Sequence, residues 1–337
     1  MENKRFAKGY GISWLTLNRE CNMRCKWCYG CSSGYDTKKS MTFEDAKKCI
    51  DIVSDMEIKK INLIGGEPTM HPNFFDIIDY AAEKKISCNV VTNGLKLVDE
   101  TFFNELLKRP NAFPSISIKS DSKESYISDT GVNCWDRIVG LIKKLLKSNK
   151  TFGCTYVISN ENVNKLYKTM KTFQELGLKN VGLSFCYSCP GNVMIYDVKQ
   201  YVKDIETQLK MVDQLSIKYN IHFTLPVCLW DKEFIDNLRK RKIISTVCQL
   251  QQKSGLIFDT NLDILVCNTL YDYPIVKAEE YNDAKTLTKL LNSDKIMNVY
   301  KDLLRLPSKK CTTCEYLENC GGGCVLTWQY LKLDDLI

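Results

Sequence analysis

Hydrophobic and polar positions alternate along residues 11–190 in a pattern that predicts strands and helices in turn. Short apolar runs predict buried strands at residues 11–17, 60–64, 87–92, 115–120, 152–159 and 181–186. Amphipathic stretches predict helices from residue 42 and at 74–83, 101–107, 135–146 and 163–176. Six strand–helix units in series favour a parallel sheet, so we expect an α/β fold organised as a partial (β/α)6 TIM-like barrel.

The pattern changes in the last third of the chain. We expect a helix at 197–218 and a strand at 221–225 to close the barrel, and a charged connecting helix at 231–242. Residues 255–259 and 264–267 predict a β-hairpin. Helical segments at 284–291 and 295–303 lead into a group of cysteines at 311–324. We therefore expect a barrel domain at residues 1–230 and a small cysteine-rich domain at residues 231–337.

Composition narrows the class of protein. No apolar run approaches the roughly 18 residues of a membrane helix, and the N-terminus has no apolar signal-peptide core, so we expect a cytoplasmic protein with no membrane partner. The chain has 337 residues, with 17 cysteines but 2 histidines. In a reducing compartment so many cysteines are expected to bind metal or act in redox chemistry, and thiolate-rich ligation favours zinc or iron–sulfur.

The basic charge balance adds little. The net charge of +7 counts every cysteine as neutral. Two [4Fe–4S] clusters on three thiolates each, and one on four, would bring this charge down to roughly +3. Scattered solvated lysines account for what remains, and we expect no nucleic-acid partner.

Three cysteines with C-x3-C-x2-C spacing, Cys21, Cys25 and Cys28, follow the first predicted strand. Three thiolates are one short of the four that an iron–sulfur cube binds, which leaves one iron open to a small molecule. A zinc site or a set of buried thiols is the alternative. The spacing alone therefore predicts a metal centre with an open position.

A glycine-rich turn follows the second predicted strand. Glycines let a backbone approach a ligand closely, and a carboxylate can accept hydrogen bonds from a cationic amine. By itself such a segment is a common structural turn. Its residues are Gly65, Gly66, Glu67 and Pro68.

These two motifs, one β/α unit apart, resemble those of the radical S-adenosylmethionine (SAM) superfamily, and the resemblance covers roughly residues 11–190. It implies that Cys21, Cys25 and Cys28 hold a [4Fe–4S] cluster whose fourth iron chelates SAM. It implies reductive cleavage of SAM to a 5′-deoxyadenosyl radical that takes a hydrogen atom from the substrate. It also implies SAM contacts from the Gly-Gly-Glu-Pro turn and from Trp27, Thr92, Asn93, Ser117 and Ser159.

One strand end departs from the superfamily pattern. Where the family often has Ser-Leu-Asp-Gly, this chain has Ser117 followed by isoleucine, Lys119 and Ser120. Lys119 can supply a cation to the SAM carboxylate, or it can be an ordinary solvated lysine.

A second cysteine motif, C-x2-C-x5-C-x3-C, ends the chain, and alone it supports zinc and iron–sulfur equally. Behind this barrel it resembles the SPASM domain, a module that carries auxiliary [4Fe–4S] clusters. The resemblance implies one cluster on Cys248, Cys267 and Cys324, although Leu262 stands where glycine is usual. It implies a second cluster on Cys311, Cys314 and Cys320 with a later cysteine. None follows Cys324 in the sequence, so we expect Asp334 or Asp335 as a ligand, an incomplete cluster, or a truncated chain.

The other cysteines have less defined roles. Cys186 and Cys189 end the sixth strand near the expected substrate, where one is a candidate hydrogen-atom donor or cluster ligand, and plain thiols are the alternative. Cys228 is a candidate fourth ligand of the first auxiliary cluster. Core positions are expected for Cys49, Cys88 and Cys154, and no role is assigned to Cys31 and Cys134.

The SPASM resemblance implies an enzyme that modifies a peptide or protein side chain, in the form of ribosomal-peptide maturation by a thioether or carbon–carbon crosslink. It implies a low-potential electron donor of flavodoxin or ferredoxin type. The barrel begins almost at once, so we expect a separate leader-peptide-binding protein. The alternatives are small-molecule chemistry, a non-enzymatic metal protein, and sulfatase-maturase-like oxidation. Against the last, Asn268 follows Cys267 where those enzymes have aspartate.

Overall fold

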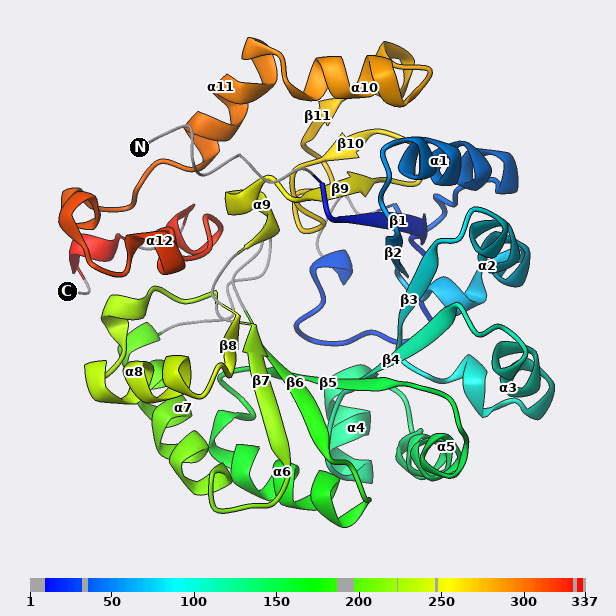
Figure 1. The fold of residues 1–337 in the computed structure, drawn as a ribbon. Helices are drawn as coiled ribbons and strands as arrows, with labels where there is room; N and C mark the ends of the chain where they lie inside the picture. Colours follow the sequence, from blue (N-terminus) through cyan, green and yellow to red (C-terminus); the bar gives the residue numbers. More distant parts are fainter. Residues whose placement is uncertain are drawn as a thin grey trace.

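The computed structural model describes residues 10–31, 36–186, 197–222, 224–245, 248–329 and 332–335. Its strands form one sheet of eleven, in the order β11-β10-β9-β1-β2-β3-β4-β5-β6-β7-β8. Strands β1 to β8 run parallel and curve into an arc with helices on its outer side (Figure 1). The predicted α/β fold with a parallel, barrel-like sheet is confirmed.

The first six strands follow the predicted apolar runs. The fourth begins earlier than expected, because Ala112 already pairs with Cys88 of the third strand. Pairing with the fifth strand starts only at Ser115, so Pro114, which has no N–H to donate, lies before that ladder. The six are β1 (Ile12–Asn18), β2 (Lys60–Gly65), β3 (Ser87–Thr92), β4 (Ala112–Ile118), β5 (Gly153–Ile158) and β6 (Asn180–Phe185).

The helices between these strands place their apolar faces on the sheet. The helix expected from residue 42 is capped by Thr42, whose side-chain oxygen accepts from the Asp45 backbone N–H at 3.1 Å. Four further helices lie where amphipathic patterns predict them. The five are α1 (Phe43–Asp55), α2 (Phe74–Glu83), α3 (Glu100–Leu107), α5 (Trp135–Lys147) and α6 (Leu166–Glu175).

One helix between the described barrel strands was not predicted. α4 (Lys123–Thr130) has no apolar periodicity, and only Tyr126 and Thr130 of its residues are buried. It starts at a Ser122 cap and ends at Gly131 in the left-handed conformation, φ +74°. The capping residues at its two ends, rather than an apolar face, therefore define this helix.

Further elements complete the arc beyond the six expected units. The predicted strand at 221–225 lies earlier, at residues 218–222, because Lys218 pairs with Asn180 of β6. The helix expected at 197–218 therefore ends at Val212. A short eighth strand then adds to the seventh. The elements are α7 (Val198–Val212), β7 (Lys218–His222), the 3-10 turn η6 (Val227–Leu229), α8 (Lys232–Lys240) and β8 (Ile244–Ser245).

The C-terminal part joins the same sheet. The predicted hairpin forms from β9 (Gly255–Phe258) and β10 (Ile264–Leu265), and β9 pairs in parallel with β1 from Ile12 onward. Leu262 in the turn has φ +67°, the left-handed conformation that glycine adopts most easily. The other elements are α9 (Gln249–Gln252), β11 (Pro274–Val276), α10 (Ala284–Leu291), α11 (Asp294–Leu303) and α12 (Leu317–Cys320).

Among the described residues, no helix is both long and apolar enough to cross a membrane.

Candidate active site

The loop after β1 carries Cys21, Cys25 and Cys28 and lies on the concave side of the arc (Figure 1). Cys25 is buried and the other two are half-buried. Burial raises the pKa of Cys21 to about 11, and the Glu67 carboxylate and the thiols of Cys25 and Cys28 add to it. The structure therefore brings the three thiols of the C-x3-C-x2-C motif together.

The glycine pair after β2 packs against the backbone that leads into this loop. The Gly66 N–H donates to the Asn18 carbonyl at 2.8 Å, and the Glu67 N–H donates to the Glu20 carbonyl at 2.8 Å. A Cβ on Gly66 would lie 2.2 Å from the Glu20 carbonyl oxygen, and one on Gly65 would lie 2.2 Å from that of Asn18. Glycine is needed at both positions because the chain approaches itself there.

The Glu67 carboxylate is buried and bonded to its own chain. Its Oε1 accepts from the Thr69 N–H (3.3 Å), the Thr69 hydroxyl (2.5 Å) and the Thr92 hydroxyl (2.6 Å). Its Oε2 accepts from the Asn93 N–H at 2.7 Å. Burial raises the pKa of Glu67, and these hydrogen bonds oppose the rise. The carboxylate expected to receive the SAM amine thus also joins the loops after β2 and β3, and Pro68 beside it is buried.

Asn93 continues this connection to the cysteine loop. Its Nδ2 donates to the Asn22 side-chain oxygen at 2.7 Å and lies 3.8 Å from the Cys21 sulfur. Its own side-chain oxygen accepts from the Leu95 N–H at 3.0 Å, which fixes the rotamer. Thr92 and Asn93, expected at the SAM site, therefore position the first cysteine.

The other end of the loop is held by α4. The Arg24 N–H donates to the Thr130 carbonyl at 2.9 Å, and the Lys26 N–H donates to the Asp129 carbonyl at 3.0 Å. The Lys26 ammonium also pairs with Glu161 at 3.1 Å, beyond the end of β5. The helix that the sequence did not predict is thus one of the supports of the site.

Lys119 faces the thiols from the end of β4. Its ammonium donates to the Ser117 hydroxyl at 2.6 Å. Burial raises the pKa of the Cys25 thiol, and the Lys119 charge lowers it, which places this cation within electrostatic range of the loop. Lys119 and Ser117 thus form a polar pair on the same side as the cysteines.

The remaining expected site residues are less directly involved. Trp27 is half-buried and packs on the core. Ser159 is buried, and its N–H donates to the Asn162 side-chain oxygen at 2.8 Å within the turn after β5. Cys186 is buried at the end of β6, and its N–H donates to the Ile158 carbonyl at 2.7 Å. Cys189 lies outside the described residues.

A buried ion pair that sequence reasoning missed joins the cysteine loop to the C-terminal part. The Arg19 guanidinium pairs with Asp259 at the end of β9, and their side chains are 4% and 6% exposed. Arg19 also lies over the Tyr271 ring, 5.3 Å from its centre. The sequence does show a charged residue directly after each of these two apolar strands. Only the pairing of β1 with β9 brings the two charges together.

The C-terminal thiols fall into two groups. Burial raises the pKa of Cys324 to about 12, and Cys267 and Cys248 add to it, so these three lie together. In the second group, burial is the main cause of the raised pKa of Cys311. The neighbouring Cys320 and Cys314 thiols and the Asp334 carboxylate raise it further. Cys228, a candidate ligand of the first group, lies near the second. Burial is the main cause of its raised pKa, and the neighbouring thiols of Cys320, Cys311 and Cys314 add to it.

The donor sets fit iron–sulfur clusters. Within the described residues, no three Cys, His, Asp or Glu side chains are close enough together to hold a single metal ion. Thiolates are the usual ligands of iron–sulfur clusters, and the thiols of each group act on one another electrostatically.

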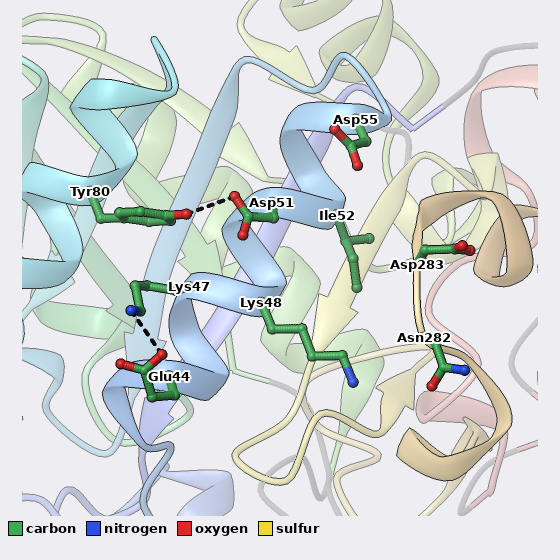
Figure 2. A pocket seen from close by; sticks show the side chains of 9 residues that line it. All are labelled: Glu44, Lys47, Lys48, Asp51, Ile52, Asp55, Tyr80, Asn282 and Asp283. Atoms are coloured by element: carbon green, nitrogen blue, oxygen red, sulfur yellow. Dashed lines mark hydrogen bonds and ion pairs between the residues drawn. The ribbon is translucent and has the colours of Figure 1, made fainter.

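A separate cavity of about 350 Å³ lies on the outer side of the barrel, between α1, α2 and the turn before α10 (Figure 2). Two of its lining contacts are local: Lys47 pairs with Glu44 at 2.8 Å, and Asp51 accepts from the Tyr80 hydroxyl at 2.8 Å. No cysteine lines it. We therefore assign it no part in the chemistry.

Comparisons with known proteins agree with this geometry. Residues 15–173 match the model of the radical SAM superfamily. The AdoMet-dependent heme synthase of Methanosarcina barkeri is 28% identical over 167 residues, 49% of this chain and 47% of the relative. The mycofactocin maturase MftC of Mycolicibacterium smegmatis is 25% identical over 158 residues, 46% of this chain and 39% of the relative. The chain thus spans about half or less of the length of these curated relatives.

Solved structures extend the likeness beyond the barrel. The structure of Streptococcus suis SuiB bound to its precursor peptide SuiA superposes with a TM-score of 0.70 at 16% identity. The superposition covers 96% of this chain and 73% of SuiB. At this identity the likeness is one of fold, and it includes the C-terminal thiol region.

Proposed function

We propose that this chain is a radical SAM enzyme that modifies a peptide or protein side chain, since residues 15–173 match the model of that superfamily. The form we favour is maturation of a ribosomal peptide by a thioether or carbon–carbon crosslink. Members of the superfamily use a [4Fe–4S] cluster and SAM, and we assign the cluster to Cys21, Cys25 and Cys28. We assign the C-terminal thiols to auxiliary clusters.

The observation that carries the proposal is the extent of the fold likeness. It covers 96% of this chain, so it includes the C-terminal thiol groups, and the matched protein was solved with a precursor peptide bound. A fold shared across both parts favours a shared class of substrate, although at 16% identity this step is our inference.

The chain's own residues prepare the site. When bound, the cluster and SAM supply the radical that breaks an unactivated C–H bond. Asn18, Gly66 and Asn93 fix the path of the cysteine loop. Lys119 places a positive charge beside Cys25, where it favours the ionised thiol that an iron ligand requires. We also assign Lys119 to the SAM carboxylate, which has the opposite charge.

Two other enzyme functions are compatible with the same site. Chemistry on a small molecule is the main alternative, since one curated relative is a heme synthase. Sulfatase-maturase-like oxidation is less favoured, because Asn268 follows Cys267 and a carboxamide is not a base. Both would use the same radical SAM domain, so the substrate decides between them.

The experiment traces hydrogen from the substrate. Cells of the source strain from which the gene for this chain has been deleted are grown in D2O, so that the substrate stays unmodified, and their extract is divided into a peptide fraction and a small-molecule fraction. Reduced, reconstituted enzyme is given unlabelled SAM and either fraction, and 5′-deoxyadenosine is analysed by mass spectrometry. The proposal expects deuterium in 5′-deoxyadenosine with the peptide fraction.

The Cys25→Ala variant is the control, because it should form no 5′-deoxyadenosine with either fraction. Deuterium transfer from the small-molecule fraction alone would overturn the proposal of a peptide substrate. The same assay, with flavodoxin or ferredoxin in place of dithionite, tests the expected electron donor. Adding a candidate leader-peptide-binding protein tests the other expected partner.

A further inference from the structure

We propose that Cys228 supplies the fourth thiolate of the second auxiliary cluster, together with Cys311, Cys314 and Cys320. Cys228 lies in η6, directly after the barrel strand β7, and far along the chain from the other three. The assignment concerns the metal site only and does not depend on which substrate the enzyme uses.

A direct contact places η6 at this cluster site. The backbone N–H of Val227 donates to the Cys320 sulfur at 3.4 Å. Backbone N–H donors to ligating sulfurs are common around iron–sulfur clusters, where they stabilise the charge on sulfur. Cys228 is the next residue, and its side chain is exposed.

The backbone on either side packs tightly against the same segment. The Cys324 N–H donates to the Thr224 carbonyl at 2.7 Å. A Cβ on Gly323 would lie 2.9 Å from the Pro226 ring, so the two stretches leave no room for a side chain between them. Gly323 has φ +83°, which a larger residue would adopt only with strain.

The helix that follows Cys228 contacts the cysteine segment from the other side. Lys232 of α8 pairs with Glu315 at 2.9 Å, and the Tyr316 hydroxyl donates to Asp236 at 3.3 Å. Arg239 lies over the Tyr316 ring, 5.2 Å from its centre. Such exposed contacts add little stability each, but together they hold η6 and α8 alongside residues 315–316.

The electrostatic neighbours of Cys228 agree with this placement. The thiols that act on Cys228 electrostatically are those of Cys320, Cys311 and Cys314. For Cys324, in contrast, the neighbouring thiols are Cys267 and Cys248. Cys228 therefore belongs with the second group of thiols and not with the first, where the sequence had suggested it.

Ligand chemistry favours Cys228 over the nearby carboxylate. Asp334 is close to Cys311, but its Oδ1 already accepts from the Ser308 hydroxyl at 2.6 Å. Thiolate is also the softer ligand and the usual one for iron–sulfur clusters. Four thiolates would complete the cluster with residues present in this chain, and would tie the end of the barrel to the cysteine-rich segment.

The test measures iron, sulfide and EPR spectra of the full chain after anaerobic reconstitution. Cys228→Ala should lose between about one and about four irons per chain, because a cube short of one thiolate loses an iron or falls apart. Protein that keeps three irons should show the EPR signal of a three-iron cluster after oxidation. Unchanged iron content with unchanged spectra would overturn the assignment.

Combined variants distinguish the two groups of thiols. Adding Cys228→Ala to a chain with Cys311→Ala, Cys314→Ala and Cys320→Ala should remove no further iron, because both changes act on one cluster. Adding Cys228→Ala to a chain in which Cys248, Cys267 and Cys324 are replaced should remove as much iron as Cys228→Ala removes from the wild type. The opposite pattern would assign Cys228 to Cys248, Cys267 and Cys324 and overturn the proposal.

Two further variants keep the test decisive. Cys88→Ala is the matched control, because Cys88 is buried in β3 and burial alone raises its pKa. It should keep all the iron. Cys228→Ser covers the case in which the alanine variant is insoluble: a hydroxyl ligand should shift the EPR spectrum of the reduced cluster. A soluble serine variant with the wild-type spectrum would overturn the assignment.

Discussion

The two thiol regions of this molecule are built in different ways. In the barrel, three cysteines come from one short loop, and its backbone is bonded to the strand ends of β1 and β2 and to α4. In the C-terminal part, the thiols come from separate stretches of chain. These stretches are carried by short elements, such as α9 and α12 of four residues each.

The difference concerns what holds each site in place. Hydrogen bonds from the strand ends and from α4 hold the loop of Cys21, Cys25 and Cys28. The C-terminal stretches have little regular structure of their own, so ligand bonds to metal must supply much of their order. We therefore expect the barrel to tolerate loss of its cluster, and the region of residues 308–324 to depend on its own.

The sharpest contrast is expected in SAM cleavage. Cys25→Ala should abolish 5′-deoxyadenosine formation under dithionite, because it removes a ligand of the only cluster assigned to SAM. The triple variant of Cys311, Cys314 and Cys320 should keep abortive SAM cleavage but stop product formation. Chromatography of the reduced, reconstituted proteins measures both.

Normal cleavage in Cys25→Ala would show that the SAM-binding cluster lies elsewhere. Full turnover in a soluble triple variant would show that the second group of thiols has no role after cleavage.

Removal of iron should lower the local stability of the C-terminal region much more than that of the barrel. After anaerobic chelation, the backbone amides of residues 308–324 should lose most of their protection from hydrogen exchange. Amides of β2, β3 and β4 should keep theirs, since sheet hydrogen bonds and core packing remain. Mass spectrometry of peptic fragments gives both readings in one experiment, and equal loss in the two regions would contradict the comparison.

The next largest effect is expected on stability, when the ion pair between the two regions is broken. Asp259→Asn leaves the Arg19 guanidinium without its buried counter-charge and should lower the free energy of unfolding by about 3–5 kcal/mol. Thermal unfolding of the metal-free chain measures this without interference from the clusters. Replacing Asp263, whose ion pair with Lys277 is half-exposed on the lysine side, should cost less. Equal losses would show that the buried pair has no special role.

The smallest effects are expected at two glycines. Gly66→Ala places a Cβ 2.2 Å from the Glu20 carbonyl, so the backbone before Cys21 must shift, at a cost of about 1–3 kcal/mol. The matched control is Gly140→Ala in α5, where nothing lies within 4 Å of the new Cβ. That change should stabilise the chain by about 0.5–1 kcal/mol. Chemical denaturation distinguishes the two signs, and a neutral Gly66→Ala would mean the close approach is not needed.

The sequence predicted what depends on local pattern. The bounds of α2 and α10 follow from apolar positions one turn apart, and Thr42 was recognisable as a cap. α4 has no such periodicity and was missed, although Arg24 and Lys26 bond to it.

Contacts between distant parts of the chain could not be predicted. Arg19 meets Asp259, 240 positions later, only because β9 pairs with β1. Cys228 was predicted as a candidate ligand of the first auxiliary cluster, whereas we propose it for the second, because spacing gives no information on which loop folds back to which. The role of the glycines is similar: the motif predicted a close backbone approach, but the partner is the chain itself.

The pairing of β1 with β9 also has a consequence for synthesis. β1 leaves the ribosome long before its partner β9, which lies 243 positions later, at Ser13 and Leu256 for example. Until then one edge of β1 presents unpaired N–H and C=O groups that can pair with another nascent chain. A fold with such distant partners forms slowly, and a chain stopped before residue 255 would keep that edge open. Residues 255–258 therefore act as the protein's protection against self-association, whatever metal the C-terminal part holds.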